Sequence, residues 1–202
     1  MIAIKSDYFK KYMIDPRRFE KLPLDWPEIF GRDGDLIVEI GFGSGEFLEE
    51  LAALNPDKNF VGFELSLISM QKAQKRFFRR GLENVRVVLV DGRFGMRELF
   101  HDGSVSRVIS NFPCPWPKKK HQKRRLIVPE FARILAAVLR EGGDFELVTD
   151  ELWFAEEAVE RFDETGCFRI EGPVADPERP IQTRYERKWK SRGKTIYLVR
   201  FI

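Results

Sequence analysis

Short β-branched and aromatic runs alternate with amphipathic segments from residue 36 to the end of the chain. The pattern predicts seven strands, at Leu36–Phe42, Asn59–Leu65, Val85–Asp91, Arg107–Pro113, Asp144–Asp150, Phe168–Glu171 and Thr195–Ile202. Apolar residues recur at helical spacing in four intervening segments, Glu46–Leu54, Ser66–Arg80, Val128–Arg140 and Leu152–Glu164. Because such alternation produces right-handed parallel crossovers, we predict an α/β fold with a doubly wound, mostly parallel, Rossmann-like seven-stranded sheet.

Glycines and the two ends of the chain refine this topology. Gly81 and the pair Gly142–Gly143 follow the second and third helical segments, where a left-handed cap residue is expected. The last strand follows a turn at Gly193 rather than a helix, so we expect it to insert antiparallel near one edge of the sheet. Residues 1–34 mix charges with three prolines and show little periodicity. We therefore expect an N-terminal arm or cap over residues 1–34 and a single domain over residues 35–202.

The composition is that of a globular protein, with 43% hydrophobic and 33% charged residues among 202. No apolar stretch approaches the roughly 18 residues that a membrane-spanning helix needs. Lys5 and Asp7 interrupt the segment that is apolar in a signal peptide, so we expect a cytoplasmic protein without membrane association. Two cysteines, Cys114 and Cys167, are too few for a disulfide framework or a cysteine-built metal site, and we expect no bound metal.

One short segment determines the sign of the net charge, which is +3. Six of the 35 basic side chains fall in residues 118–125, which contain no acid, and the rest of the chain has 29 basic and 32 acidic residues. Concentrated positive charge of this kind commonly faces a phosphate backbone, although charged runs also occur on solvated surfaces that bind nothing.

The first predicted strand ends in a glycine-rich turn, Gly41-Phe42-Gly43-Ser44-Gly45, and a helix follows directly. Glycines permit a tight turn and let a ligand approach the backbone at the carboxyl edge of the sheet. A dinucleotide-binding fold has the spacing G-x-G-x-x-G, whereas this chain has G-x-G-x-G with Glu39 two residues before it. The turn predicts a nucleotide-like ligand, and its spacing disfavours a nicotinamide dinucleotide.

Three acids at the ends of three successive predicted strands narrow the choice of ligand. Glu39 suits a cation and would repel a pyrophosphate. Glu64 is placed to accept ribose hydroxyls, and Asp91 is placed to reach the amino group of adenine. S-adenosylmethionine carries a sulfonium and an ammonium group and no phosphate, so the set favours this cofactor. Any one of these acids alone would be interpreted as an ordinary solvated turn residue.

The fourth predicted strand leads into a proline-rich loop, Asn111-Phe112-Pro113-Cys114-Pro115-Trp116-Pro117, and then into the basic segment. Alternate prolines stiffen the loop and hold it extended. The loop lies where a methyl acceptor is expected, with Trp116 as a stacking surface for a base and the adjoining cations for phosphates. For Trp116 alone, a place in the hydrophobic core is an equally good interpretation.

These motifs recur together in one family. They are Val38-Glu39-Ile40-Gly41-Phe42-Gly43-Ser44-Gly45, Phe63-Glu64, Asn111-Phe112-Pro113, Pro115-Trp116-Pro117-Lys118-Lys119, Thr149-Asp150, Arg179-Pro180, Thr183-Arg184-Tyr185-Glu186 and Lys188-Trp189. From about residue 36 onward the sequence resembles the bacterial tRNA (guanine-N7-)-methyltransferases. The resemblance implies a class I methyltransferase fold that uses S-adenosylmethionine to methylate guanine at nucleotide 46 in the variable loop of tRNA.

The resemblance also implies roles for individual residues. Cofactor contacts are expected from Glu39, Gly41, Gly43, Gly45, Glu64, Asp91 and Cys114. Contacts to tRNA are expected from Lys118, Asp150, Thr183, Arg184, Tyr185 and Glu186. The basic segment from Thr183 to Lys194 then forms a second wall of the RNA site, whereas without the resemblance it predicts an exposed turn. The sequence leaves open whether the protein is a monomer or a homodimer.

Cys114 departs from the family pattern, which usually has an aspartate, proposed to be catalytic, at this position. Guanine N7 has an exposed lone pair, so the enzyme's main task is alignment rather than proton removal. We expect Asp150 or Glu186 to supply the carboxylate, with Cys114 as a small spacer. The alternatives are a slower enzyme, a tRNA-binding protein that has lost the reaction, and a methyltransferase for another substrate.

Overall fold

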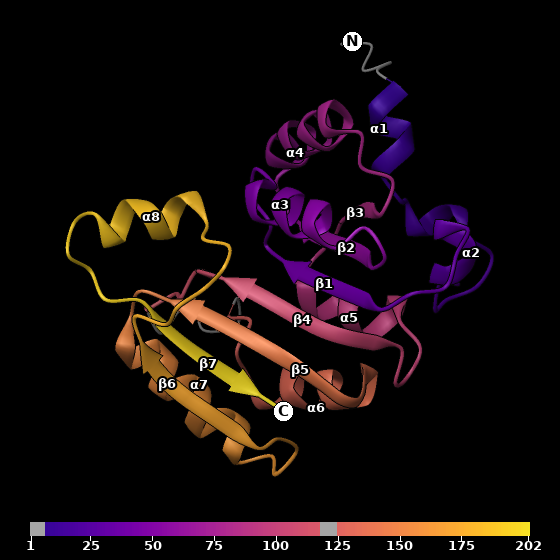
Figure 1. The fold of residues 1–202 in the computed structure, drawn as a ribbon. Coiled ribbons are helices and arrows are strands. Elements are labelled where there is room, and N and C mark those ends of the chain that lie inside the picture. Colours follow the sequence, from indigo (N-terminus) through magenta and orange to yellow (C-terminus); the bar gives the residue numbers. More distant parts are fainter. Residues whose placement is uncertain (1–6, 118–124) are drawn as a thin grey trace. The chain divides into compact units, whose positions relative to one another are not determined.

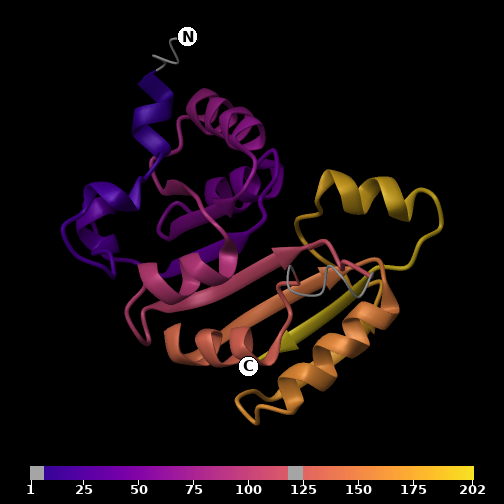
Figure 2. The ribbon, with the colours of Figure 1, turned by 180° about the vertical axis from the view of Figure 1, so that it is seen from behind.

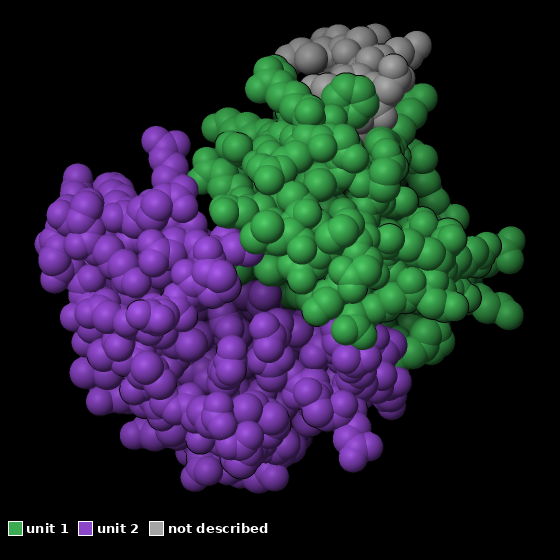
Figure 3. All heavy atoms as spheres, in the orientation of Figure 1, with its two compact units in different colours: residues 1–101 green, residues 102–202 purple. Residues whose placement is uncertain are grey.

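The computed structural model describes residues 7–117 and 125–202, and the chain divides into two compact units, residues 1–101 and 102–202 (Figure 3). The first unit contains α1 (Asp7–Tyr12), a 3-10 helix η1 (Pro16–Arg18), α2 (Trp26–Phe30), β1 (Leu36–Ile40), α3 (Glu46–Leu54), β2 (Asn59–Glu64), α4 (Leu67–Arg80), β3 (Val85–Leu89) and α5 (Gly92–Leu99). The second contains β4 (Val105–Asn111), α6 (Pro129–Val138), β5 (Leu139–Thr149), α7 (Leu152–Asp163), β6 (Ile170–Ala175), α8 (Arg184–Lys190) and β7 (Tyr197–Phe201) (Figure 1).

The strands have the mixed pairing that the sequence predicts. In the first unit the strands follow the order β3-β2-β1 and all pairs are parallel. In the second the order is β4-β5-β7-β6, where β4 and β5 are parallel and β7 is antiparallel to both of its neighbours. The α/β fold, the seven strands and the antiparallel last strand next to an edge strand are therefore confirmed.

Each unit has its own hydrophobic core. In the first, β1 is buried along its whole length, as is typical of parallel strands covered on both faces. The largest buried side chains there include Phe60, Phe63 and Phe77. In the second unit the ring centroids of Phe162 and Phe201 lie 4.3 Å apart, and α6 and α7 pack against the strands, away from α8 (Figure 2).

The segment before β1 is integrated into the first unit. The buried hydroxyl of Tyr12 donates to the carbonyl of Leu82 at 2.8 Å, and Nε1 of the buried Trp26 donates to the carbonyl of Leu99 at the same distance. Buried polar atoms need such partners, and both partners come from elements far along the chain. Residues 7–34 thus contribute to the core of this unit, and their status as an arm or cap stays a prediction.

The predicted end of the third helical segment is wrong. The helix α6 stops at Val138, because Leu139 is already extended and pairs with Val105 in the ladder between β4 and β5. Gly142 has a left-handed φ of 72°, but it lies inside β5 next to a register irregularity rather than at a helix cap. Gly81, by contrast, is the left-handed cap of α4 as predicted.

Four α-helices of the described residues were not predicted, namely α1 and α2 before β1, and α5 and α8 further along the chain. The helix α5 contains glycines at 92 and 95, which lower helix propensity, but a Cβ at Gly95 would lie 2.6 Å from the ring of Phe63, so tertiary packing requires them. The helix α8 precedes β7, where a turn alone was expected. None of the helices in the described ranges combines the length and the apolar character that crossing a lipid bilayer requires.

The contact between α3 and α4 depends on Gly45. This residue precedes α3 with a φ of 73°, and a Cβ there would lie 2.5 Å from Cβ of Ala73 and 2.9 Å from the ring of Phe77, both in α4. Gly81 has a similar φ of 70°, but a Cβ there would meet nothing within 4 Å. An alanine at Gly81 therefore introduces backbone strain alone, whereas an alanine at Gly45 introduces backbone strain and a steric clash with α4.

We predict that Gly45→Ala lowers the free energy of unfolding by about 3 kcal/mol. The left-handed conformation costs an L-residue about 1–2 kcal/mol, and overpacking adds about 1–3 kcal/mol. The matched control Gly81→Ala is expected to lose only the first contribution. Urea unfolding of both variants measures the difference, and equal losses would show that the contact with α4 adjusts without cost.

Candidate functional site

The glycine turn in the first unit exposes backbone next to open space. Gly41 and Gly43 have φ values of 78° and 56°, in the region that favours glycine. A Cβ at either position would meet no atom within 4 Å, so the surface above the turn is open. The turn is held against β2, because the amide of Gly41 donates to the carbonyl of Phe63 at 2.8 Å.

Glu64 fixes the middle of this turn. Its Oε2 accepts a hydrogen bond from the amide of Gly43 at 2.9 Å, and its Oε1 accepts from the amides of Leu65 at 2.8 Å and Ser66 at 2.9 Å. The carboxylate is thereby oriented by three neutral donors, and among residues 7–117 and 125–202 no cation forms an ion pair with it. Three of the roughly four lone-pair directions of a carboxylate are in use.

The other two predicted cofactor acids are Glu39, which lies in β1, and Asp91, which follows β3. Glu39 is buried in β1, opposite Gly62 in β2. Asp91 follows β3 and caps α5, accepting from the amides of Arg93 at 3.0 Å and Phe94 at 3.4 Å. Because the strands are parallel, Glu39, Glu64 and Asp91 all lie toward their carboxyl ends, as the sequence predicts. Their roles toward a cofactor stay predictions.

In the second unit, the loop after β4 has strained backbone. Phe112 and Trp116 have φ values of 53° and 45°, in a region that bulky residues rarely adopt. The amide of Phe112 donates to the carbonyl of Val148 at 2.7 Å, which ties the start of the loop to β5. Cys114 is exposed and free, as is Cys167. Lys118 and the rest of the basic segment up to residue 124 lie outside the described residues.

Arg125 ends the basic segment, and the expectation that it belongs to a phosphate-binding surface is wrong. Its side chain is 4% exposed, and its Nη1 contacts both carboxylate oxygens of Glu157, at 2.6 and 2.7 Å. It also donates to the carbonyl of Trp116 at 3.1 Å. Arg125 therefore anchors the proline-rich loop to α7, where a buried ion pair satisfies its charge.

The predicted tRNA-binding segment forms the helix α8. Thr183 is its N-cap, and its hydroxyl accepts from the amide of Glu186 at 2.9 Å. Arg184 and Tyr185 are exposed on the first turn, whereas Glu186 is completely buried. The spacing Thr-x-x-Glu is a sequence signature of a helix start, and it is the signal from which α8 could have been predicted.

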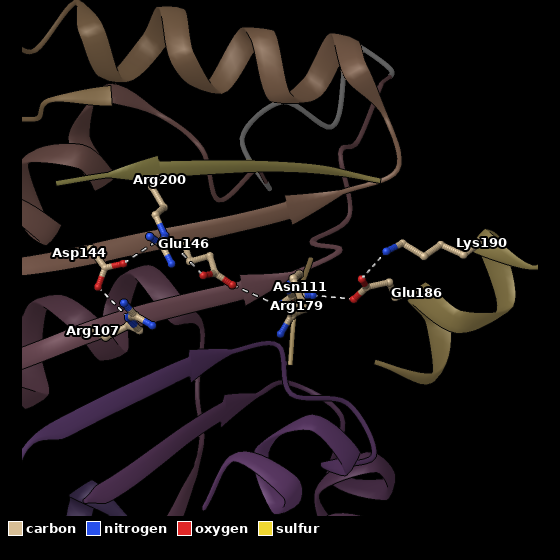
Figure 4. Close-up of polar contacts among 8 residues, drawn as sticks. All are labelled: Arg107, Asn111, Asp144, Glu146, Arg179, Glu186, Lys190 and Arg200. Atoms are coloured by element: carbon tan, nitrogen blue, oxygen red, sulfur yellow. Dashed lines mark hydrogen bonds and ion pairs between the residues drawn. The ribbon is translucent and has the colours of Figure 1, made fainter. Parts of the chain in front are cut away.

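Arg179 connects α8 to two strands (Figure 4). Its side chain is 5% exposed and contacts Oε2 of Glu186 at 2.6 Å, Oδ1 of Asn111 at 2.8 Å and Oε1 of Glu146 at 3.1 Å. These partners come from α8, the end of β4 and the middle of β5. Bidentate guanidinium geometry suits such a junction, because one rigid fork fixes several acceptors.

The network extends along β5 and α8 (Figure 4). Nζ of Lys190 lies 3.5 Å from Oε1 of Glu186. On the strand side, Arg107 contacts Asp144 at 2.7 Å, and Arg200 lies between Asp144 and Glu146, at 4.0 and 3.8 Å. The alternation of Asp144 and Glu146 with Phe145 and Leu147 is the sequence signal from which a charged face on this strand could have been predicted.

A second polar cluster surrounds Asp150 at the end of β5. Oδ2 of Asp150 accepts from Nζ of Lys194 at 2.9 Å and from the hydroxyl of Tyr185 at 3.3 Å. The hydrogen bond to Asp150 raises the pKa of Lys194, while burial, followed by the charge of Asp150, raises the pKa of Tyr185. Lys194 also lies 4.6 Å from the ring centroid of Trp189, and Tyr185 lies 4.7 Å from that of Phe112. The structure thus brings together Asp150 and Tyr185 as sequence-predicted residues, and adds Lys194.

Comparison with known proteins defines the relationships of the chain. A family model described as "Putative methyltransferase" matches residues 33–199. A protein named tRNA (guanine-N(7)-)-methyltransferase from Thermotoga maritima is 52% identical over 94% of this chain and 60% of its own length. A protein of the same name from Streptococcus thermophilus is 34% identical over 86% of this chain and 83% of its own length.

Solved structures show the same fold. The 16S rRNA methyltransferase KamB aligns with a TM-score of 0.66 over 95% of this chain and 98% of its own, at 17% identity. An antibiotic-related methyltransferase aligns with a TM-score of 0.64 over 88% of this chain and 91% of its own, at 16% identity. Among the curated relatives, the chain spans about 60% of the length of the Thermotoga maritima protein and 61% of a Thermus thermophilus protein of the same name.

We predict that Arg179→Ala destabilises the protein by about 3–5 kcal/mol, because removing one partner leaves buried carboxylates at Glu186 and Glu146 without their main cation. Arg184→Ala, on the exposed side of α8, is the control and is expected to change stability by less than about 0.5 kcal/mol. Chemical denaturation measures both values. A loss below about 1 kcal/mol for Arg179→Ala would mean that the junction does not hold α8 in place.

Proposed function

The chain belongs to the tRNA (guanine-N(7)-)-methyltransferase family, and from this premise we propose that it transfers a methyl group from S-adenosylmethionine to N7 of guanine 46 in the variable loop of tRNA. The observation that carries the proposal is the carboxylate of Glu64, which three backbone amides orient beside the open glycine turn of the first unit. The tRNA substrate accords with the cytoplasmic location that we also propose.

The residues of the first unit fit this cofactor. Bound S-adenosylmethionine supplies an electrophilic methyl group on a positively charged sulfur. The buried Glu39 carries the negative charge that suits the cationic end of such a molecule. Glu64 is held by backbone amides, so its carboxylate is already oriented when it accepts a ribose hydroxyl. Asp91 would then bind the adenine amino group, as the exposed N-cap of α5.

The guanine side of the reaction needs no general base. N7 carries a free lone pair, so the protein contributes by aligning the base and by offsetting the positive charge that the ring acquires. We assign the second task to Asp150, whose Oδ2 is fixed by Lys194 and Tyr185. Cys114 then acts as a small spacer in the loop after β4 and not as a nucleophile.

The burial of α8 residues divides the predicted tRNA contacts into two groups. Arg184 and Tyr185 are exposed and are proposed to contact the RNA directly. Thr183 caps the helix and Glu186 is enclosed by Arg179 and Lys190, so we propose that both act by positioning α8. Lys118 is proposed to contact tRNA on the basis of the family motif alone.

A catalytically impaired tRNA-binding protein is the second candidate, and the observation that favours it is Cys114 at the position of the family aspartate. It predicts binding of cofactor and tRNA without turnover. The two candidates therefore differ in one measurement.

We expect the protein to transfer labelled methyl from S-adenosylmethionine to unmodified tRNA, with 7-methylguanosine in the variable loop identified by mass. Cys114→Asp is expected to keep or raise the rate, because it restores a second carboxylate that can offset charge on the ring. Cys167→Asp, at the other exposed free cysteine, is the control and should leave the rate unchanged.

Other outcomes separate the candidates. Binding of both ligands without transfer would establish the impaired protein, and a gain of transfer in Cys114→Asp would locate the defect. A large loss of rate in Cys114→Asp would show that the loop is adapted to the thiol.

We predict that Glu64→Gln weakens binding of S-adenosylmethionine by roughly tenfold to a hundredfold, because a hydrogen bond to a charged group contributes about 1.5–3 kcal/mol. Glutamine has one acceptor oxygen where Glu64 uses two, so the variant keeps either the bond from Gly43 or those from Leu65 and Ser66, and its unfolding midpoint should fall slightly. The titration is therefore carried out well below that midpoint. Asp57→Asn, an exposed charge in the same unit, is the control. Calorimetric titration gives the affinities, and unchanged cofactor binding would remove Glu64 from the site.

A further inference from the structure

Positive charge in the first unit is concentrated on one helix. Residues 7–101 contain 15 basic and 16 acidic side chains. Five of the basic residues and none of the acidic ones lie in α4, which is Leu67–Arg80. The remainder of residues 7–101 therefore has more acidic than basic side chains, whereas α4 is positively charged.

Three of these cations form a straight stripe on the outer face of α4. Met70, Ala73, Gln74 and Phe77 define the buried face. At 100° per residue, the positions opposite that face are 68, 72, 75 and 79, which follow the i, i+4, i+7, i+11 spacing of one helix face. Lys72, Lys75 and Arg79 are all exposed, one per turn, within roughly 11 Å along the helix axis.

The stripe differs from its neighbours in how its charge is compensated. Arg76 pairs with Glu46 and Glu49 at 3.1 and 3.2 Å, and Arg80 lies 3.9 Å from Glu49, so these two side chains hold α4 against α3. Within the described ranges, no ion pair to a carboxylate involves Lys72, Lys75 or Arg79. The contact between α3 and α4 thus explains Arg76 and Arg80, whereas no ion pair within the described ranges explains the three cations of the stripe.

We propose that the stripe of Lys72, Lys75 and Arg79 binds the phosphate backbone of tRNA, as a contact surface additional to α8 and to the basic residues proposed to contact tRNA around Lys118. The proposal rests on the proposed function, which supplies RNA as the partner. Three cations in a row neutralise successive phosphates and fix the orientation of a nucleic acid without reading its sequence. A protein partner is disfavoured, because protein interfaces have an apolar or aromatic centre with few charges. On this face the exposed apolar side chain of Ile68 lies at one end, and the three turns that follow are charged.

The test compares two triple variants that change the charge equally. The first is Lys72→Gln, Lys75→Gln and Arg79→Gln, where glutamine preserves helix propensity. The second, as control, is Arg17→Gln, Arg18→Gln and Lys21→Gln, which removes three exposed cations from the same unit. Fluorescence anisotropy with unmodified tRNA, over a range of salt concentrations, gives the slope of log K against log salt for each protein.

We expect the stripe triple to reduce the magnitude of this slope by about 2–3, since each lost phosphate contact removes about 0.7–0.9. Affinity at moderate salt should fall by at least about tenfold, and the control triple should keep the wild-type slope. The single variant Lys75→Gln, with an expected reduction of about 0.7–0.9, provides the same test if the triple variant folds poorly.

Three results would overturn the inference: an unchanged slope in the stripe triple, equal losses in both triples, or unchanged tRNA binding with loss of binding to phosphatidylserine vesicles. The last result would assign the stripe to an anionic membrane surface. Methyl transfer by the wild type is measured on the same preparation. Absence of transfer together with a reduced slope refutes the proposed function and supports the stripe, whereas transfer with unchanged slopes does the reverse.

Discussion

In the second unit, the position of α8 relative to the strands depends on one buried guanidinium group. Arg179 holds Glu186 of α8, Asn111 at the end of β4 and Glu146 of β5 with contacts of 2.6–3.1 Å. A charge in this environment is tolerated only when its partners are fixed, so the same contacts that stabilise Arg179 also determine where α8 lies relative to the strands. The exposed side chains of Arg184 and Tyr185 take their positions from this junction.

In the first unit, backbone amides orient the carboxylate of Glu64. Its carboxylate at Glu64 is oriented by three backbone amides, which fix direction without cancelling charge. Glu186, in contrast, is neutralised by Arg179 and Lys190. Glu64 and Glu186, which belong to two motifs of the same family, therefore differ in whether a cation is paired with the carboxylate. The first is suited to attract a cationic or hydroxyl-bearing ligand, and the second is suited to hold a helix in place.

The substitution at Cys114 is easier to understand with these contacts in view. In the proposed reaction the methyl acceptor already has a lone pair, so alignment matters more than proton transfer. The proline-rich loop is anchored at both of its ends. The amide of Phe112 donates a hydrogen bond to the carbonyl of Val148, and the guanidinium of Arg125 donates one to the carbonyl of Trp116. Neither contact involves the side chain at position 114, so this position tolerates a residue without a carboxylate as far as the loop's own structure is concerned.

The sequence by itself determined the features that depend on local pattern. Apolar periodicity predicted all seven strands and four of the helices, and the glycine turn with Glu39, Glu64 and Asp91 was located because each residue lies next to a strand end.

Only the tertiary structure decided which charges face inward. Arg125 and Glu186 belong to polar segments that predict exposure, yet each is buried because a partner distant in sequence, Glu157 or Arg179, satisfies its charge. The same reason applies to α5, whose glycines are unfavourable in a helix until Ile40 packs against Gly92 and the ring of Phe63 packs against Gly95. Sequence patterns record the preferences of neighbours along the chain, whereas burial of a charge depends on contacts that form only when distant segments meet.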